Sequence, residues 1–226
     1  MIEIILTYVP RDSDDLAAGA RMIRSFAKSI HIDIDDALLA PHLTWPYTAP
    51  GVFSDVDLTP TKGLFAEIHL MVKDANDIGV VFARAGAKRI IGHLEGFRDM
   101  NAARAALHAW REAGALEVGL GLLFQTPLAG LEHIVEECDV VHLMSIATIG
   151  VQGIPYVPTA PARIAEFHQR FPGATISVDG GVSRSNIVDL ARAGARRFGV
   201  GSAILKAPDP EAAYQELKTL AENAVK

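Results

Sequence analysis

The sequence has a single cysteine, and it lacks both a long apolar run and a secretion signal. Cys138 has no second cysteine to pair with, so no disulfide can form within the chain. No stretch of about 18 or more uncharged apolar residues occurs, which argues against a transmembrane helix. The N-terminal residues carry neither a basic segment nor a cleavage site of the kind that directs export. Together these absences predict a cytoplasmic protein.

Clusters of Lys and Arg are also absent. The chain has 21 Lys and Arg against 27 Asp and Glu, a formal net charge of -6 that is spread along the sequence. A nucleic-acid groove or an anionic membrane surface needs clustered basic residues, so we expect neither as a partner. Backbone N–H groups at the start of a helix can still bind a small anion.

The residues that are present suffice for a large apolar core. Of the 226 residues, 50% are hydrophobic, a composition too apolar for a disordered chain. No domain linker or low-complexity tract interrupts the sequence. We therefore predict one domain over residues 1–226.

Short β-rich runs alternate with amphipathic helical stretches almost to the end of the chain. The predicted strands are Ile2–Tyr8, Ile30–Ile34, Glu67–Met71, Arg89–Gly92, Val118–Leu122, Val140–Ser145, Thr175–Val178 and Arg197–Val200. The predicted helices are Asp14–Lys28, Ala75–Ala85, Met100–Ala113, Pro127–Glu136, Ala160–Phe171, Arg184–Ala193 and Asp209–Ala224. Three Ala-Gly-Ala segments, centred on Gly86, Gly114 and Gly194, predict left-handed glycine caps after helices.

Repeated β-then-α units imply a parallel sheet with right-handed crossovers. Eight such strands predict a (β/α)8 TIM barrel. An open, doubly wound sheet is the alternative, but no Gly-x-Gly-x-x-Gly follows the first strand. The segment Pro41–Lys62 is rich in Pro, Thr and Gly, so it predicts an irregular second crossover.

The second predicted strand carries polar residues on one face. His31 and Asp33 are two residues apart between β-branched neighbours, so their side chains point to the same side of a buried strand. Burying an imidazole and a carboxylate there costs several kcal/mol (on the order of 2–7 each) unless something compensates. A bound metal ion is the obvious candidate.

Two more residues of this kind fall at strand ends: His69 in the third strand and Asp179 after the seventh. In a TIM barrel the chemistry lies at the C-terminal ends of the strands. Two imidazoles and two carboxylates form a mixed N/O set that suits divalent Zn, Fe, Mn or Co. Any one of these residues alone has an ordinary structural explanation, but all four at the active end of one barrel predict a metal site.

Glycine-rich turns follow the last two predicted strands. Asp179-Gly180-Gly181 precedes one helix, and Gly201-Ser202 follows the eighth strand. Loops at these two places commonly form a phosphate site from bare backbone amides. A phosphorylated substrate is therefore expected.

Three further polar residues lie in or just after predicted strands. His93 and Glu95 are either a pair that supports a ligand from behind or the exposed end of the fourth strand. His142 lies within the sixth strand and is interpreted as a hydrogen-bonded core histidine.

Several motifs resemble, in order along nearly the whole chain, those of the ribulose-phosphate 3-epimerase family. They are Ile30-His31-Ile32-Asp33, Pro41-His42-Leu43-Thr44, Ile68-His69-Leu70-Met71-Val72, Leu143-Met144-Ser145, Tyr156-Val157-Pro158, Val178-Asp179-Gly180-Gly181-Val182 and Val200-Gly201-Ser202-Ala203-Ile204. The family is a (β/α)8 barrel that inverts C3 of D-ribulose 5-phosphate to give D-xylulose 5-phosphate.

The resemblance implies roles for individual residues. The metal ligands would be His31, Asp33, His69 and Asp179, with Asp33 and Asp179 also acting as the acid/base pair on opposite faces of the substrate. The implied contacts to a small phosphorylated sugar are His69, Met71, Met144, Gly150, Gly153, Gly180, Gly181, Gly201 and Ser202. The resemblance also implies a divalent-metal cofactor and a homo-oligomer.

Three segments depart from the family pattern. Thr7 and its neighbours replace a strand-one segment that contains a substrate-contacting serine, and Asp35 stands where a methionine covers the intermediate. The loop Ala147–Gly153, which closes over substrate in the family, has one glycine fewer. The departures bear on which ketose phosphate is accepted, a pentulose or a hexulose phosphate.

Two other functions are weighed beside the epimerase. A related decarboxylase or aldolase is disfavoured, because Asp-x-Lys-x-x-Asp does not appear on the second or third strand and no predicted strand contains a lysine. A diverged barrel that binds a sugar phosphate without turnover is the other alternative, motivated by Asp35 and the altered loop.

Overall fold

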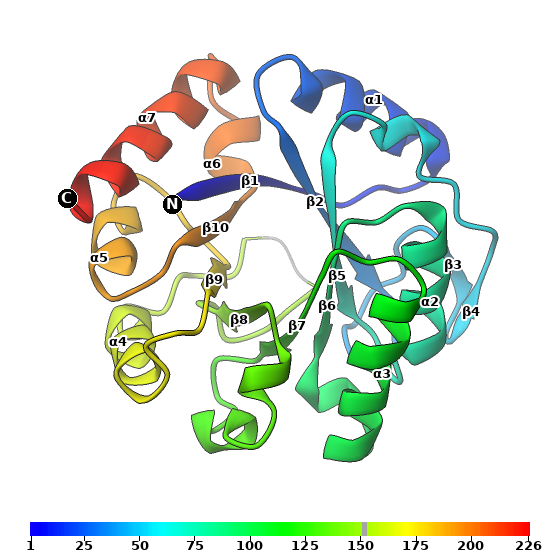
Figure 1. The fold of residues 1–226 in the computed structure, drawn as a ribbon. Helices are drawn as coiled ribbons and strands as arrows, with labels where there is room; N and C mark the ends of the chain where they lie inside the picture. The colour runs from blue at the N-terminus through cyan, green and yellow to red at the C-terminus, as the bar shows by residue number, and fades with distance from the viewer. Residues whose placement is uncertain (151–152) are drawn as a thin grey trace.

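Eight parallel strands close into a barrel surrounded by helices, as a computed structural model of the chain shows (Figure 1). The structure describes residues 1–150 and 153–226. The barrel strands are β1 Glu3–Tyr8, β2 Ser29–Asp35, β5 Phe65–Met71, β6 Arg89–His93, β7 Glu117–Leu122, β8 Val140–Met144, β9 Ile176–Asp179 and β10 Arg197–Val200. Around the barrel they follow chain order, and β10 pairs with β1 to close it. The predicted (β/α)8 TIM barrel is confirmed.

The helices form the outer layer. They are α1 Ser13–Arg24, α2 Asn76–Ala85, α3 Met100–Glu112, α4 Ala160–Arg170, α5 Ile187–Arg192, α6 Ser202–Leu205 and α7 Pro210–Ala224. The three glycines expected to end helices all have positive φ, between 106° and 122°. No helix among the described residues combines the length and the apolar character needed to span a lipid bilayer.

One predicted helix is wrong. Pro127–Glu136 forms two short 3-10 turns, η3 Leu128–Leu131 and η4 Val135–Glu137, instead of a continuous helix. Gly130 lies inside the segment and is a poor helix former. Leu128 and Leu131 still bury their side chains, so short turns are enough to cover the barrel here.

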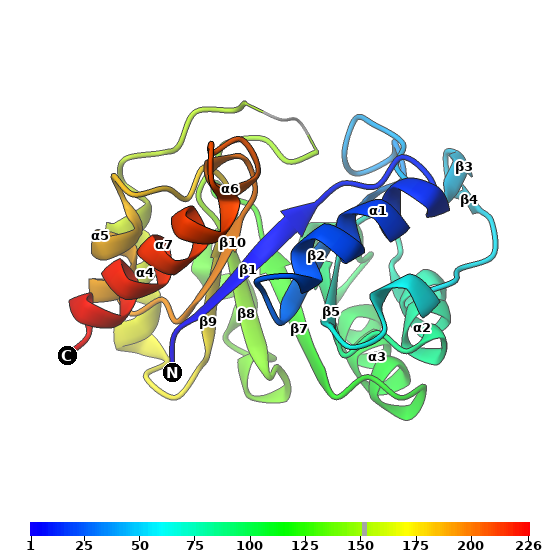
Figure 2. The same cartoon turned by 90° about the horizontal axis from the view of Figure 1, so that it is seen from above.

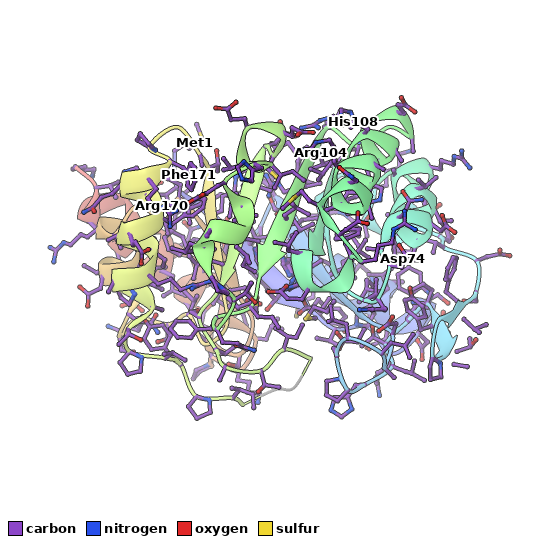
Figure 3. All side chains as sticks on the ribbon, turned by 90° about the horizontal axis from the view of Figure 1, so that it is seen from below. Met1, Asp74, Arg104, His108, Arg170 and Phe171 are labelled. Atoms are coloured by element: carbon purple, nitrogen blue, oxygen red, sulfur yellow. The ribbon has the colours of Figure 1, made fainter. Side chains whose placement is uncertain are left out.

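The second crossover is irregular, as predicted. It contains the two-stranded sheet of β3 Tyr47–Ala49 and β4 Val52–Phe53, followed by the turn η1 Thr59–Thr61. Figure 2 shows β3, β4 and the segment after β8 at the same end of the barrel, the end to which the strands run. Met1 and the α3 residue His108 lie at the opposite end (Figure 3).

The starts of the strands hold a buried ionic network inside the barrel. Arg89 is 2% exposed and pairs with Glu67 at 2.5 Å, with Glu117 at 2.7 Å and with Glu3 at 3.2 Å. Arg197 adds a second contact to Glu117, at 2.6 Å. This network fills the end of the barrel where the strands begin, a place usually filled by branched apolar side chains. Through Glu67, which also contacts His31, the network reaches the candidate site.

Candidate active site

The four predicted metal ligands converge inside the barrel. Because strand side chains alternate, His31 and Asp33 both point inward from β2, and His69 points inward from the neighbouring β5. Oδ1 of Asp33 lies 3.0 Å from Nε2 of His31 and 2.8 Å from Nδ1 of His69. Asp179 ends β9, and one of its oxygens lies within 4.8 Å of a ring nitrogen of His31 and of His69.

His142 joins this cluster from β8. One ligand atom from each of His31, His69, His142 and Asp179 lies within 4.8 Å of the others. The interpretation of His142 as a fully hydrogen-bonded core residue is wrong. Its Nδ1 lies 3.0 Å from Oγ of Ser177, but its Nε2 is buried without a hydrogen-bond partner among the described residues.

A carboxylate stands behind His31. Nδ1 of His31 donates to Oε1 of Glu67 at 2.5 Å, and the other oxygen of Glu67 accepts from Arg89. All three side chains are buried. This arrangement orients the ring so that Nε2 faces the centre of the barrel, as in the carboxylate–histidine pairs that support metal ligands.

A second chain of contacts stands behind His69. Its Nε2 lies 2.8 Å from Nε2 of His93, and Nδ1 of His93 lies 3.2 Å from Oε2 of Glu95. Glu95 in turn accepts from the Leu123 N–H at 2.9 Å and from the Thr126 hydroxyl. His93 is completely buried and contacts the predicted ligand His69, so the pair is not the exposed end of a strand.

The two central carboxyl groups differ in acidity. Burial disfavours the charge on Asp33, but the charge and hydrogen bond of His31, with the hydrogen bond of His69, outweigh it and lower the pKa of Asp33. Burial and the charge of Asp33 raise the pKa of Asp179 to about 7. In the metal-free protein Asp33 therefore loses its proton at a lower pH than Asp179 does.

The three imidazoles also differ in pKa. Burial opposes the charge on His31, but Asp33 and Glu67 outweigh it and raise the pKa of His31 well above its usual value. Burial lowers the pKa of His69 to about 4, and burial also lowers the pKa of His142 well below its usual value. His69 and His142 are therefore neutral, the form in which imidazole binds metals.

The donor set fits a divalent cation. Neutral imidazoles and carboxylates are ligands for Zn, Fe, Mn and Co. Donors about 2.1 Å from one ion are about 3 to 4 Å from each other, and the distances from Asp33 to both histidines lie near this range. A bound cation would take the place of the proton that His31 carries in the metal-free protein.

A cavity of about 510 Å³ opens above the cluster. The carboxylates of Asp33 and Asp179 line it. Five of the predicted substrate contacts also line it: Gly153, Gly180, Gly181, Gly201 and Ser202. Thr7 also lines the cavity, and it belongs to the β1 segment that replaces the family segment with a substrate-contacting serine. Gly180 and Gly181 have φ values of 106° and 70°, and a Cβ on Gly180 would lie 2.7 Å from Ile146, so the turn requires glycine.

The two predicted methionines lie beside this cavity and not in its lining. Met71 and Met144 form a small apolar cluster with Ala40, Ile146 and Ile149. Met144 is in register with Asp179, and Met71 is in register with Asp35.

Asp35 is buried next to the loop after β8. Its Oδ1 has no hydrogen-bond partner in the described part of the chain, and burial followed by the charge of Asp33 raises its pKa to about 8. A Cβ on Gly150 would lie 3.3 Å from the other oxygen of Asp35, so this predicted contact residue approaches Asp35 and does not line the cavity. Val151 and Gln152, part of the predicted Ala147–Gly153 loop, lie outside the described residues.

Sequence reasoning missed Gly199 and Glu67. A Cβ on Gly199 would lie 2.7 Å from Oδ1 of Asp179, so this bare position in β10 makes room for the carboxylate. A glycine inside a strand often marks such a close approach, which is the signal that could have found it. Glu67, two residues before His69 in the same strand, repeats the spacing of His31 and Asp33 and could have been found by that spacing.

Comparisons with known proteins agree with this architecture. Solved structures of similar fold include KGPDC from Streptococcus mutans, with a TM-score of 0.70, 12% identity and coverage of 100% of this chain and 100% of that chain. They also include 3-hexulose-6-phosphate synthase from Salmonella typhimurium, with a TM-score of 0.69, 17% identity and coverage of 99% and 100%. These likenesses show that the fold is that of the (β/α)8 barrels.

The sequence comparisons narrow this class to one family. The model of the ribulose-phosphate 3 epimerase family matches residues 10–205. Ribulose-phosphate 3-epimerase of Escherichia coli K12 is 31% identical over 206 residues, which cover 88% of this chain and 87% of that protein. Ribulose-phosphate 3-epimerase 1 of Cupriavidus necator is 31% identical over 199 residues, covering 84% and 78%. The chain belongs to the ribulose-phosphate 3-epimerase family, whose members are isomerases acting on sugar phosphates.

Proposed function

We propose that the protein inverts C3 of a ketose phosphate, converting D-ribulose 5-phosphate to D-xylulose 5-phosphate or acting on a related sugar phosphate. The observation that carries the proposal is the shared cavity of Asp33 and Asp179. These carboxylates come from β2 and β9, which are separated around the barrel by β1 and β10. They therefore reach a bound substrate from different directions.

Inversion next to a carbonyl needs a base on one face of the carbon and an acid on the other. In one direction Asp33 removes the C3 proton, and Asp179 delivers a proton to the opposite face of the planar enediolate. The roles exchange in the reverse direction. Both groups lie in a buried environment, where a positioned carboxylate is most effective.

A divalent cation would be held by His31, Asp33, His69 and Asp179. When bound, it would supply positive charge next to the substrate oxygens on which negative charge develops. Glu67 would orient the imidazole of His31, and His93 would orient that of His69, each through a contact to the ring nitrogen that faces away from the cation. Met71 and Met144 support the wall of the cavity, because they pack with Ile146, which lines it.

The phosphate would bind at the glycine turns on the rim of the cavity. Gly181, Gly201 and Ser202 offer backbone N–H groups there, and Thr7 adds a hydroxyl on the same wall. Binding by backbone donors fits a small phosphorylated sugar and an acidic chain without a basic cluster.

The test is hydrogen exchange at C3. The metal-loaded protein is incubated in D₂O with a panel of ketose phosphates that includes ribulose 5-phosphate and hexulose 6-phosphates. We expect deuterium at C3 of at least one substrate, together with its C3 epimer. No incorporation with any member of the panel would reject the epimerase.

The same panel separates the alternatives. Calorimetric binding of a ketose phosphate without exchange would favour a barrel that only binds its ligand. A decarboxylase or aldolase that uses a strand lysine is disfavoured, because no described strand contains lysine. A homo-oligomer and a cytoplasmic location remain predictions, and light scattering of the purified protein tests the first.

A further inference from the structure

His142 is a residue of the candidate site to which the family resemblance assigns no role. It lies on β8, two residues before Met144, so its side chain points into the barrel like that of Met144. The ring is completely buried. Its centroid lies 5.6 Å from that of His31 and 4.6 Å from that of His69, so the three imidazoles lie side by side.

One nitrogen of His142 is already engaged, and the other is not. Nδ1 lies 3.0 Å from Oγ of Ser177, in the strand next to β8. Nε2 has no hydrogen-bond partner among the described residues, although it is fully enclosed. A buried polar atom without a partner is costly, and such an atom in a native protein needs an explanation.

The surroundings of the ring identify what could partner Nε2. A nitrogen of His142 lies within 4.8 Å of one ligand atom of each of His31, His69 and Asp179. Because Nδ1 faces Ser177, Nε2 is the nitrogen left to face this cluster. When Nδ1–H donates to Ser177, Nε2 carries a lone pair and no proton, which is the form that binds a metal.

We propose that His142 is a third imidazole ligand of the divalent-metal site. The inference rests on the metal centre of the proposed function and changes its composition. The site then offers three histidines with Asp33 and Asp179, in place of two histidines and two carboxylates. Imidazole ligands suit Zn, Fe and Co better than Mn, which prefers oxygen ligands, so the third histidine disfavours Mn.

The direct test is the number of imidazoles bound to the metal. The metal-free full-length protein is loaded with one equivalent of Co²⁺ or Zn²⁺, and X-ray absorption at the metal edge counts the imidazole ligands. We expect three. A count of two, or no binding of either ion, would overturn the proposal, and this measurement needs no variant.

Affinity measurements on variants provide a second readout. Competition titration of His142→Leu, which keeps an apolar side chain in the core, is expected to show Co²⁺ and Zn²⁺ bound at least about tenfold more weakly. Mn²⁺ affinity should change less. His108→Leu is the control, because His108 is an exposed histidine at the other end of the barrel (Figure 3) and should bind metal as the unmodified protein does.

The melting temperature supplies a third readout. Because a ligand that binds the folded protein stabilises it in proportion to its affinity, added Zn²⁺ should raise the melting temperature of His142→Leu less than that of the unmodified protein. Unchanged metal affinity in a folded His142→Leu would overturn the proposal. If the metal binds three imidazoles but no C3 exchange occurs, the proposed function is rejected and this inference stands. If C3 exchange occurs but the metal binds only two imidazoles, this inference is rejected and the proposed function stands.

Discussion

Nδ1 of His31 lies 2.5 Å from Oε1 of Glu67, so a buried carboxylate holds the imidazole whose other nitrogen faces Asp33. Glu67 is held in turn by Arg89. The orientation of a candidate metal ligand therefore depends on residues that do not line the cavity.

Replacing Glu67 tests this dependence. Glu67→Gln keeps the shape of the side chain but removes its charge, so His31 loses the anionic partner that fixes its ring. We expect the dissociation constant for a divalent cation to rise about 10–100-fold, measured by competition titration. Glu117→Gln is the matched control, because Glu117 also pairs with Arg89 but does not contact His31. Equal weakening in both variants would contradict a specific effect on His31.

Replacing Asp33 and Asp179 one at a time tests the proposed role of each in proton transfer. Asp33→Asn and Asp179→Asn should each lower the rate of C3 inversion by at least about 10²–10⁴-fold, because either one removes a proton carrier. The rate is followed by NMR of the sugar phosphate, and circular dichroism checks that the fold is kept. A folded variant of either residue with normal turnover would refute the role assigned to that residue.

Asp35 makes the stability of the metal-free protein depend on pH. Its pKa is raised to about 8 in the fold, mainly by burial, and an acid with a raised pKa binds more protons when folded than when unfolded. Its ionisation therefore costs stability as the pH rises from about 4 to about 8, by at most about 6 kcal/mol.

Asp35→Asn removes that titration. We expect the stability difference in favour of the variant, measured by urea unfolding of the metal-free protein, to widen as the pH rises from 4 to 8. A difference that stays constant with pH would show that Asp35 is not the group responsible.

Gly199 should control the placement of Asp179. The added Cβ of Gly199→Ala would lie 2.7 Å from Oδ1 of Asp179 and push the carboxylate aside. Displacement of a reacting group by about 1 Å can cost 10²-fold in rate, so kcat should fall by about that factor. Gly173→Ala is the control, since a Cβ at that position meets nothing within 4 Å. Steady-state kinetics measures kcat for both variants. Full activity in Gly199→Ala would contradict the proposal that Gly199 controls the placement of Asp179.

The barrel and the cluster of four candidate ligands could be predicted from the sequence because both depend on local patterns. Alternation of β-rich and amphipathic segments predicts the barrel. The spacing of His31 and Asp33 puts both on one face, and parallel strands bring their C-terminal ends to one place. His69 and Asp179 follow from the same rule.

The partners of those residues could not be predicted, because they depend on contacts between distant parts of the chain. Glu67 is 36 residues from His31, and the unpartnered nitrogen of His142 becomes evident only when its surroundings are known. The open choice for His93 depended on whether His69 lies next to it. The segment around Gly130 was misjudged because its apolar spacing fits a helix as well as two short turns.

The buried guanidinium of Arg89 has a consequence for how the chain folds. Its carboxylate partners come from β1, β5 and β7, and Arg197 of β10 completes the group. A fragment that ends partway around the barrel would bury this cation beside an incomplete set of counter-charges, a state that costs about 3–5 kcal/mol when a partner is missing. Half-barrels of this chain should therefore be less stable than the closed barrel, because neither half can assemble the whole group.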